Sequence, residues 1–140
     1  MAEETGAGQA ASAPTQTTSL PLPLLMVLTW AVPGLGHLLL RRRLRACVFA
    51  AVIVVSFVVG LLLQGELILP RPGDPLSYLA AIATLGNGAL FFLAEAVGLG
   101  QGLVTAVSWE YGNTFLLTAG MMNLLLVLDV HDIVTGRKDW

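Results

Sequence analysis

Long apolar segments without charge alternate along the chain with short polar segments that contain almost all of the charged residues. Asp, Glu, Lys and Arg are absent from residues 5–40, 46–65, 75–94 and 111–128. A helix of about 20 apolar residues is long enough to cross the roughly 30 Å hydrocarbon layer of a bilayer. The pattern therefore predicts an all-α, polytopic integral membrane protein.

The lengths of these segments predict four transmembrane helices in a single helical membrane domain that spans residues 20–140. We expect the helices at about residues 22–40, 46–63, 77–97 and 113–130. Pro33 lacks a backbone donor and is followed by Gly34, so the first helix should kink or open near its last third. The alternative is three transmembrane helices plus one re-entrant or interfacial segment.

Residues 1–19 differ from the rest of the chain because they are small and polar, with no large apolar side chain after Met1. Such a segment buries too little apolar surface to offset the entropy lost on ordering. We therefore expect a flexible N-terminal tail.

Composition excludes a soluble domain, because 56% of the residues are hydrophobic and 11% are charged, whereas soluble domains have about 25% charged residues. The net charge of −2 gives no basis for nucleic-acid binding. The expected partners are membrane lipids and either other membrane protein subunits or further copies of the chain. Cys47, the single cysteine, lies among apolar residues, and we expect it to be a small buried side chain.

The positions of Lys and Arg predict the orientation in the membrane. Four of the seven basic residues lie in residues 41–45, so this turn should be cytoplasmic. With four crossings Arg137 and Lys138 would lie on the side of the membrane opposite to this turn. The cytoplasmic side would then have four basic residues and the other side three. With three crossings they would lie on the same side as the basic turn, which gives six basic residues on the cytoplasmic side and one on the other. The alternatives differ in where they place the C-terminus.

Ionisable side chains in transmembrane segments are candidates for function, because each costs about 2.5–3.5 kcal/mol at the centre of the bilayer. His37 lies near the end of the first expected helix and Glu95 near the end of the third, which should reach the same side. The pair could accept protons or bind a lipid headgroup. It could also be a structural polar contact, with Arg41 or Arg42 as a further partner of Glu95, and we favour this interpretation because polar residues near the interface cost little.

Asp129 and Asp132 are one helical turn apart, with His131 between them, and the four-helix arrangement places them at the other end of the bundle from His37. Two carboxylates could bind a metal or a cationic substrate, but a recognisable metal site has three or four ligands. We therefore interpret them as a solvated helix end. Asn87 and Asn123 are expected to form interhelical hydrogen bonds. No catalytic, cofactor-binding or metal-binding residue is predicted, and no cofactor is expected.

Residues 30–46, WAVPGLGHLLLRRRLRA, resemble the opening of the two-transmembrane-helix domain family, which has the motif Pro-Gly-x-Gly-His. Leu39 stands where that family usually has tyrosine, and Arg41 stands where it often has glycine. Residues 25–138 are also similar to small bacterial inner-membrane proteins that share this opening. The resemblance implies a bacterial inner membrane and supplies no activity. The matching positions are Pro33, Gly34, Gly36 and His37.

These observations favour a non-enzymatic membrane protein that acts through helix packing, as an accessory, assembly or structural subunit. Ser56 and Gly60, and the series Ala80, Thr84 and Gly88, place small residues at the four-residue spacing that lets helices approach closely. The alternative function is a small transporter or proton-conducting module that uses His37 and Glu95.

Overall fold

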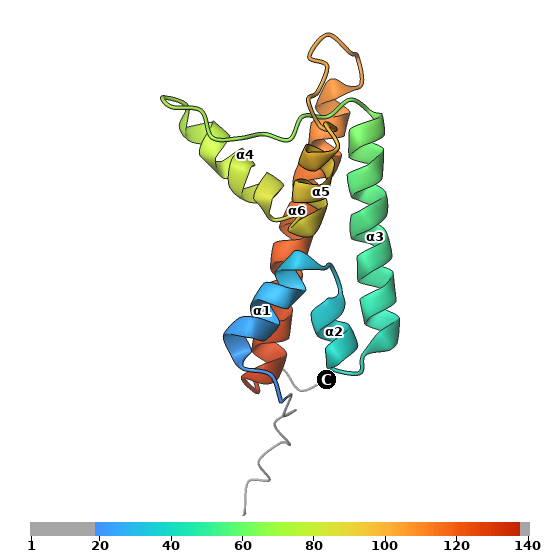
Figure 1. The fold of residues 1–140 in the computed structure, drawn as a ribbon, viewed down its shortest axis with the longest axis vertical. Coiled ribbons are helices and arrows are strands. Elements are labelled where there is room, and N and C mark those ends of the chain that lie inside the picture. Colours follow the sequence, from blue (N-terminus) through green and yellow to red (C-terminus); the bar gives the residue numbers. More distant parts are fainter. Residues whose placement is uncertain (1–18, 138–140) are drawn as a thin grey trace, which may run out of the picture.

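The computed structural model describes residues 19–137, which fold entirely into helices and their connections (Figure 1). The expected flexible tail falls almost wholly outside these residues. An all-α fold is confirmed, although the boundaries of the helices differ from the expected ones. In chain order the helices are α1 (Leu22–Ala31), α2 (Leu35–Leu39), α3 (Arg43–Leu62), α4 (Pro75–Leu85), α5 (Ala89–Ala96) and α6 (Trp109–Val134).

Two of these helices, α3 with 20 residues and α6 with 26, are each long and apolar enough to cross a membrane. A third crossing is possible by length and composition if α4 and α5 are counted as one span, but the two are bent by 99° at their junction. The described chain therefore has two to three candidate spans, fewer than the four expected. The last helix begins at Trp109 rather than at residue 113.

The first expected span, residues 22–40, is not one helix but the pair α1 and α2, which together form a hairpin. Figure 1 shows α1 and α2 running in opposite directions. Gly34 turns the chain between them with a φ of 82°, a value that favours glycine. Because α1 has only ten residues, it is about 15 Å long, half of the hydrocarbon layer. The expected break at Pro33 is confirmed, but the continuous crossing is wrong.

The third expected span, residues 77–97, is divided in the same way. The chain bends by 99° at residues 86–88, so that α4 runs toward the middle of the molecule and α5 leads back toward the end from which α4 started (Figure 1). Gly88 has a φ of 61°, and its Cα packs against the carbonyl group of Trp30 at the end of α1. The tips of the two hairpins therefore meet.

The central element of the fold is α6, which packs against α1, α2, α3 and α4. It runs antiparallel to α3, with Gly112 beside Gly60 at one end of the pair. The small-residue faces expected to mediate packing are used inside the chain: Gly60 contacts Leu116, and Thr84 is fully buried. The main apolar core consists of Ile53, Phe57, Leu67, Phe91, Ala94, Leu116, Ala119 and Leu126.

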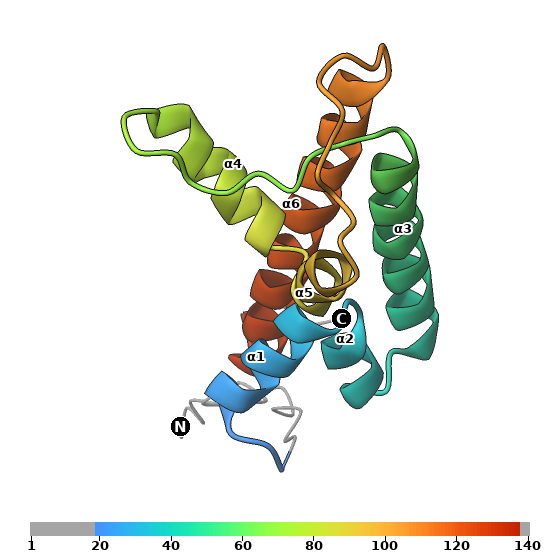
Figure 2. The same cartoon turned by 45° about the horizontal axis from the view of Figure 1, so that its top comes forward.

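The two ends of the molecule differ in charge. One end, called the basic end below, contains the start of α3 and the end of α6, with Arg41, Arg42, Arg43, Arg45 and Arg137. The other, called the acidic end, contains the two long connections, residues 63–74 and 97–108, which Figure 2 shows close together. The acidic end has one basic residue among those described, Arg71, and four acids. Those acids are Glu66, Asp74, Glu95 and Glu110.

Candidate functional site

The Pro-Gly-x-Gly-His segment is tied to α6 by a hydrogen bond between two side chains that are far apart in the sequence. His37 Nε2 lies 2.9 Å from Asp129 Oδ2. A carboxylate can only accept a hydrogen bond, so the imidazole donates from Nε2. The hairpin of α1 and α2 is thereby fixed to the last third of α6.

The imidazole of His37 is completely buried, whereas the side chain of Asp129 is 22% exposed. Phe49 of α3 covers the imidazole, with ring centroids 5.6 Å apart in an edge-to-face arrangement. His37 Nδ1 has no hydrogen-bond partner among the described residues. His37 therefore depends on Asp129 for its polar contact, and Asp129 in turn reaches the surface of the molecule.

The exposed side of Asp129 opens into a groove between α3 and α6 with a volume of about 680 Å³. The walls are apolar toward the middle of the molecule and charged at the basic end. Arg45 contributes from the first turn of α3, next to Asp129 and Asp132 from α6. The lining residues are Arg45, Phe49, Met122, Leu125, Leu126, Leu128, Asp129 and Asp132.

A second polar group, in the middle of the molecule, joins the tips of the two hairpins. Asn123 Nδ2 donates to the carbonyl oxygens of Trp30, at 2.8 Å, and of Gly86, at 2.9 Å. Trp30 Nε1 donates to the carbonyl oxygen of Leu85 at 3.0 Å. These carbonyls lie at helix ends, where the backbone has no intrahelical donor, and an unsatisfied group in the bilayer core would cost several kcal/mol. Asn123 thus makes both breaks tolerable inside a membrane.

Asn87 stabilises the second break from the other side. Its Nδ2 donates to the carbonyl oxygens of Thr84, at 3.0 Å, and of Leu116 in α6, at 3.1 Å. The expectation that Asn87 and Asn123 connect helices through hydrogen bonds is confirmed. Their acceptors are backbone carbonyls at helix breaks and in α6, which the sequence did not indicate.

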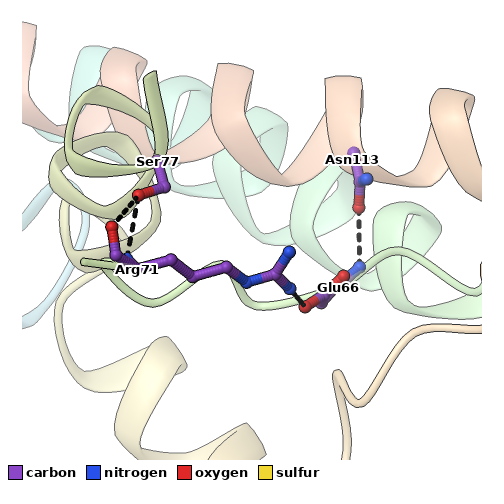
Figure 3. Close-up of polar contacts among 4 residues, drawn as sticks. All are labelled: Glu66, Arg71, Ser77 and Asn113. Carbon is purple, nitrogen blue, oxygen red and sulfur yellow. Dashed lines mark hydrogen bonds and ion pairs between the residues drawn. The ribbon is translucent and has the colours of Figure 1, made fainter. Parts of the chain in front are cut away.

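At the acidic end, polar contacts hold the connection after α3 against α6 and α4 (Figure 3). Asn113 Oδ1 accepts a hydrogen bond from the backbone N–H of Glu66 at 2.6 Å. Arg71 Nη2 pairs with Glu66 Oε1 at 2.7 Å, and Ser77 Oγ accepts from the N–H of Arg71 at 2.8 Å. Because the Arg71 side chain is 66% exposed, we assign this network to loop anchoring.

The structure does not bring His37 and Glu95 together. Glu95 is exposed at the acidic end, where it lines a small cavity with Glu66 and Arg71. The reason is the reversal at residues 86–88, which sends α5 back to the end where α4 began. The same reversal lets α6 start at the acidic end and finish at the basic end. The expectation that Asp129 and Asp132 lie at the opposite end from His37 is therefore wrong.

Comparison with known families identifies the group to which the chain belongs. A family of unknown function, DUF6677, matches residues 24–139. The chain belongs to this family. The match covers every described helix apart from the first two residues of α1 and includes both His37 and Asp129. No curated protein and no solved structure matches the chain.

Two residues that line the groove in this DUF6677 protein, Arg45 and Phe49 of α3, were not predicted from the sequence. The sequence does not show that this side of α3 lies next to α6. One available signal lay in α6, where Met122, Leu125, Asp129 and Asp132 follow the three- and four-residue spacing of a single helix face. That spacing joins the two aspartates to an apolar stripe. It does not show that His37 packs behind it.

Proposed function

We propose that this protein is a non-enzymatic integral membrane protein of the bacterial inner membrane that acts through helix packing, as an accessory or assembly subunit. The observation that carries the proposal is the outer face of α3. Val48, Val52 and Val55 are 51%, 42% and 60% exposed on this face. None of the charged residues falls between Ala46 and the end of α3.

Small side chains interrupt the valines on this face. Cys47 and Ala51 are both exposed and four residues apart, which is the spacing that allows the backbones of two helices to approach closely. The expectation that Cys47 is buried is wrong, because α3 turns it away from α6. The face therefore offers a shallow, uncharged surface to another membrane helix, either a partner subunit or a second copy.

The charge difference between the two ends supports an orientation with the basic end in the cytoplasm. Five of the six described basic residues lie at the basic end, and cytoplasmic ends are enriched in Lys and Arg. This distribution agrees with the alternative in which the C-terminus shares a side with residues 41–45. The resemblance of the Pro33–His37 motif to bacterial inner-membrane proteins supports the same membrane.

The single cysteine provides a direct test of the proposal. Isolated membranes that contain the full chain are treated with an oxidant, and cross-linked products are identified by mass spectrometry after extraction in a mild detergent. We expect a disulfide-linked dimer through Cys47 if copies pack through α3, or a constant co-purifying membrane protein if the partner is another chain. Replacement of Ala51 by Trp should abolish either product.

The matched control moves the thiol to another exposed position. In the variant Cys47→Ala with Leu79→Cys, the cysteine lies on α4, where Leu79 is 65% exposed. This variant should not cross-link at the rate of the native chain. A strictly monomeric protein with nothing co-purifying, or equal cross-linking from both positions, would contradict the proposal.

A further inference from the structure

We propose that the groove between α3 and α6 binds one acyl chain of a zwitterionic phospholipid whose headgroup carries a primary ammonium. The groove lies along one edge of the packing face of α3. Arg45 and Phe49 line the groove, whereas Cys47 and Ala51 belong to the outer face. Two residues along an α-helix correspond to a rotation of about 200°, so Cys47 points away from the groove, whereas Val52, seven residues after Arg45, borders it.

The size and lining of the groove suit an acyl chain. Its volume of about 680 Å³ falls within the range of roughly 300–1,000 Å³ found for small-molecule sites. Phe49, Met122 and Leu125 form its apolar walls, and Leu125 is 59% exposed. An apolar chain can therefore lie along α6 in contact with these side chains rather than with other lipid tails.

The length of the groove matches one leaflet of a bilayer. From Met122 to Asp132 there are ten residues, which correspond to about 15 Å of helix, half of the roughly 30 Å hydrocarbon layer. Toward the acidic end α3 and α6 close directly on each other, because a Cβ at Gly60 would lie 2.9 Å from the carbonyl oxygen of Gly112. A crossing partner helix would require a surface that continues along the whole pair, so a single chain entering from the basic end fits better.

The charges at the open end of the groove specify the headgroup. Arg45 offers a guanidinium suited to phosphate, while Asp129 and Asp132 offer carboxylates suited to an ammonium group. Asp132 is accessible, with 40% of its side chain exposed. The headgroup of an anionic lipid without an amine offers no cation to the exposed carboxylate of Asp132. His37 acts as a positioning residue, since it holds Asp129 from behind at 2.9 Å.

The test measures which lipid stays with the full chain. The protein is placed in nanodiscs that contain equal amounts of phosphatidylethanolamine and phosphatidylglycerol, released, and analysed by native mass spectrometry for retained lipid. We expect one phosphatidylethanolamine to be retained in preference to phosphatidylglycerol. Asp132→Asn should reduce this preference by roughly tenfold, equivalent to about 1.4 kcal/mol. Leu125→Trp, which fills the groove from an exposed position, should reduce the retention of both lipids.

Two control variants separate the groove from general charge effects. Glu110→Gln removes an acid at the acidic end, and Arg43→Gln removes a cation from the basic turn without altering the lining of the groove. Both should retain phosphatidylethanolamine as the native chain does. Equal retention of the two lipids, or unchanged preference in Asp132→Asn and Leu125→Trp, would overturn the proposal. A co-purifying protein that Leu125→Trp alone displaces would also overturn it, in favour of a partner helix.

Discussion

His37 Nε2 and Asp129 Oδ2 lie 2.9 Å apart although 92 positions separate the two residues in the sequence. The contact joins the hairpin of α1 and α2 to the end of α6, and it places a fully buried imidazole directly behind a carboxylate that lines the groove. Both the Pro-Gly pair and the histidine of the Pro-Gly-x-Gly-His motif therefore have structural roles. Pro33 and Gly34 turn the chain, and His37 then reaches α6.

The His37–Asp129 contact can be measured with a double-mutant cycle. His37→Leu and Asp129→Leu each remove a hydrogen bond that involves a charged group, so each should lower the free energy of unfolding by roughly 1.5–3 kcal/mol. The double variant should lose clearly less than the sum of the two, because it leaves neither group without its partner. Thermal unfolding in a mild detergent measures the three values.

Glu95 supplies the matched control for this cycle. Combining His37→Leu with Glu95→Leu should give additive losses within about 0.5 kcal/mol, because the two residues lie at opposite ends of the molecule. Additive losses for His37 and Asp129, together with coupling between His37 and Glu95, would show that the contact described here is incorrect.

Asn123 should be important for stability because it satisfies carbonyls at both helix breaks. In Asn123→Leu the side chain keeps a similar size, but Trp30 O and Gly86 O lose their donor. We expect the free energy of unfolding to fall by roughly 1–3 kcal/mol. Thr114→Val is the control, since Thr114 is exposed on α6 and its hydroxyl donates to the carbonyl oxygen of Glu110 one turn away. Equal effects of the two substitutions would argue against a stabilising role for the hydrogen bonds of Asn123 at the two helix breaks.

A comparison of Gly34 and Gly73 separates the cost of backbone strain at a positive φ from the cost of steric crowding by a new Cβ. Both have positive φ, 82° and 91°, but a Cβ at Gly34 would lie 2.6 Å from Ala46 O, whereas a Cβ at Gly73 would meet nothing within 4 Å. Gly73→Ala should cost about 1–2 kcal/mol from backbone strain alone. Gly34→Ala should cost more, because it also pushes the hairpin away from α3. Chemical unfolding of both variants in detergent tests the difference, and equal losses would contradict the close approach.

The arrangement of the helices predicts the sidedness of the chain. Reporter fusions after Trp140 and within residues 41–45 should report the same side of the membrane, the cytoplasm. A cysteine introduced at Gly73, in a Cys47→Ala background, should react with an impermeant thiol reagent added from the opposite side. Reporters on opposite sides would instead support four crossings and would contradict the two hairpins.

Part of the fold could be predicted from the sequence because it depends on local chemistry. The uncharged run of residues 46–65 is long enough for a span and contains no proline, and α3 forms there from Arg43 to Leu62. Pro33 and Gly34 marked the first break, because a missing donor and a left-handed residue interrupt any helix. Asn87 and Asn123 were expected to bond to other helices, since an amide inside a bilayer needs partners.

The direction of the chain after each break could not be predicted in this way. A glycine at residue 88 permits either a kink or a reversal, and the choice depends on what the tip of the hairpin contacts. Here Gly88 fits against Trp30 and Asn123 bonds to both tips, so the reversal is stabilised by residues distant in sequence. That one reversal moved Glu95 to the acidic end and Asp129 to the basic end.

The sequence by itself determined that this chain is a membrane protein, because the transfer free energy of apolar side chains is a property of short segments. It also determined where the first helix breaks, because proline removes a backbone donor wherever it stands. Only the tertiary structure decided that His37 meets Asp129 rather than Glu95 and that Arg45 faces Asp132 across a groove. These pairings follow from packing around α6, whose energy depends on residues that are brought together only when both hairpins have closed.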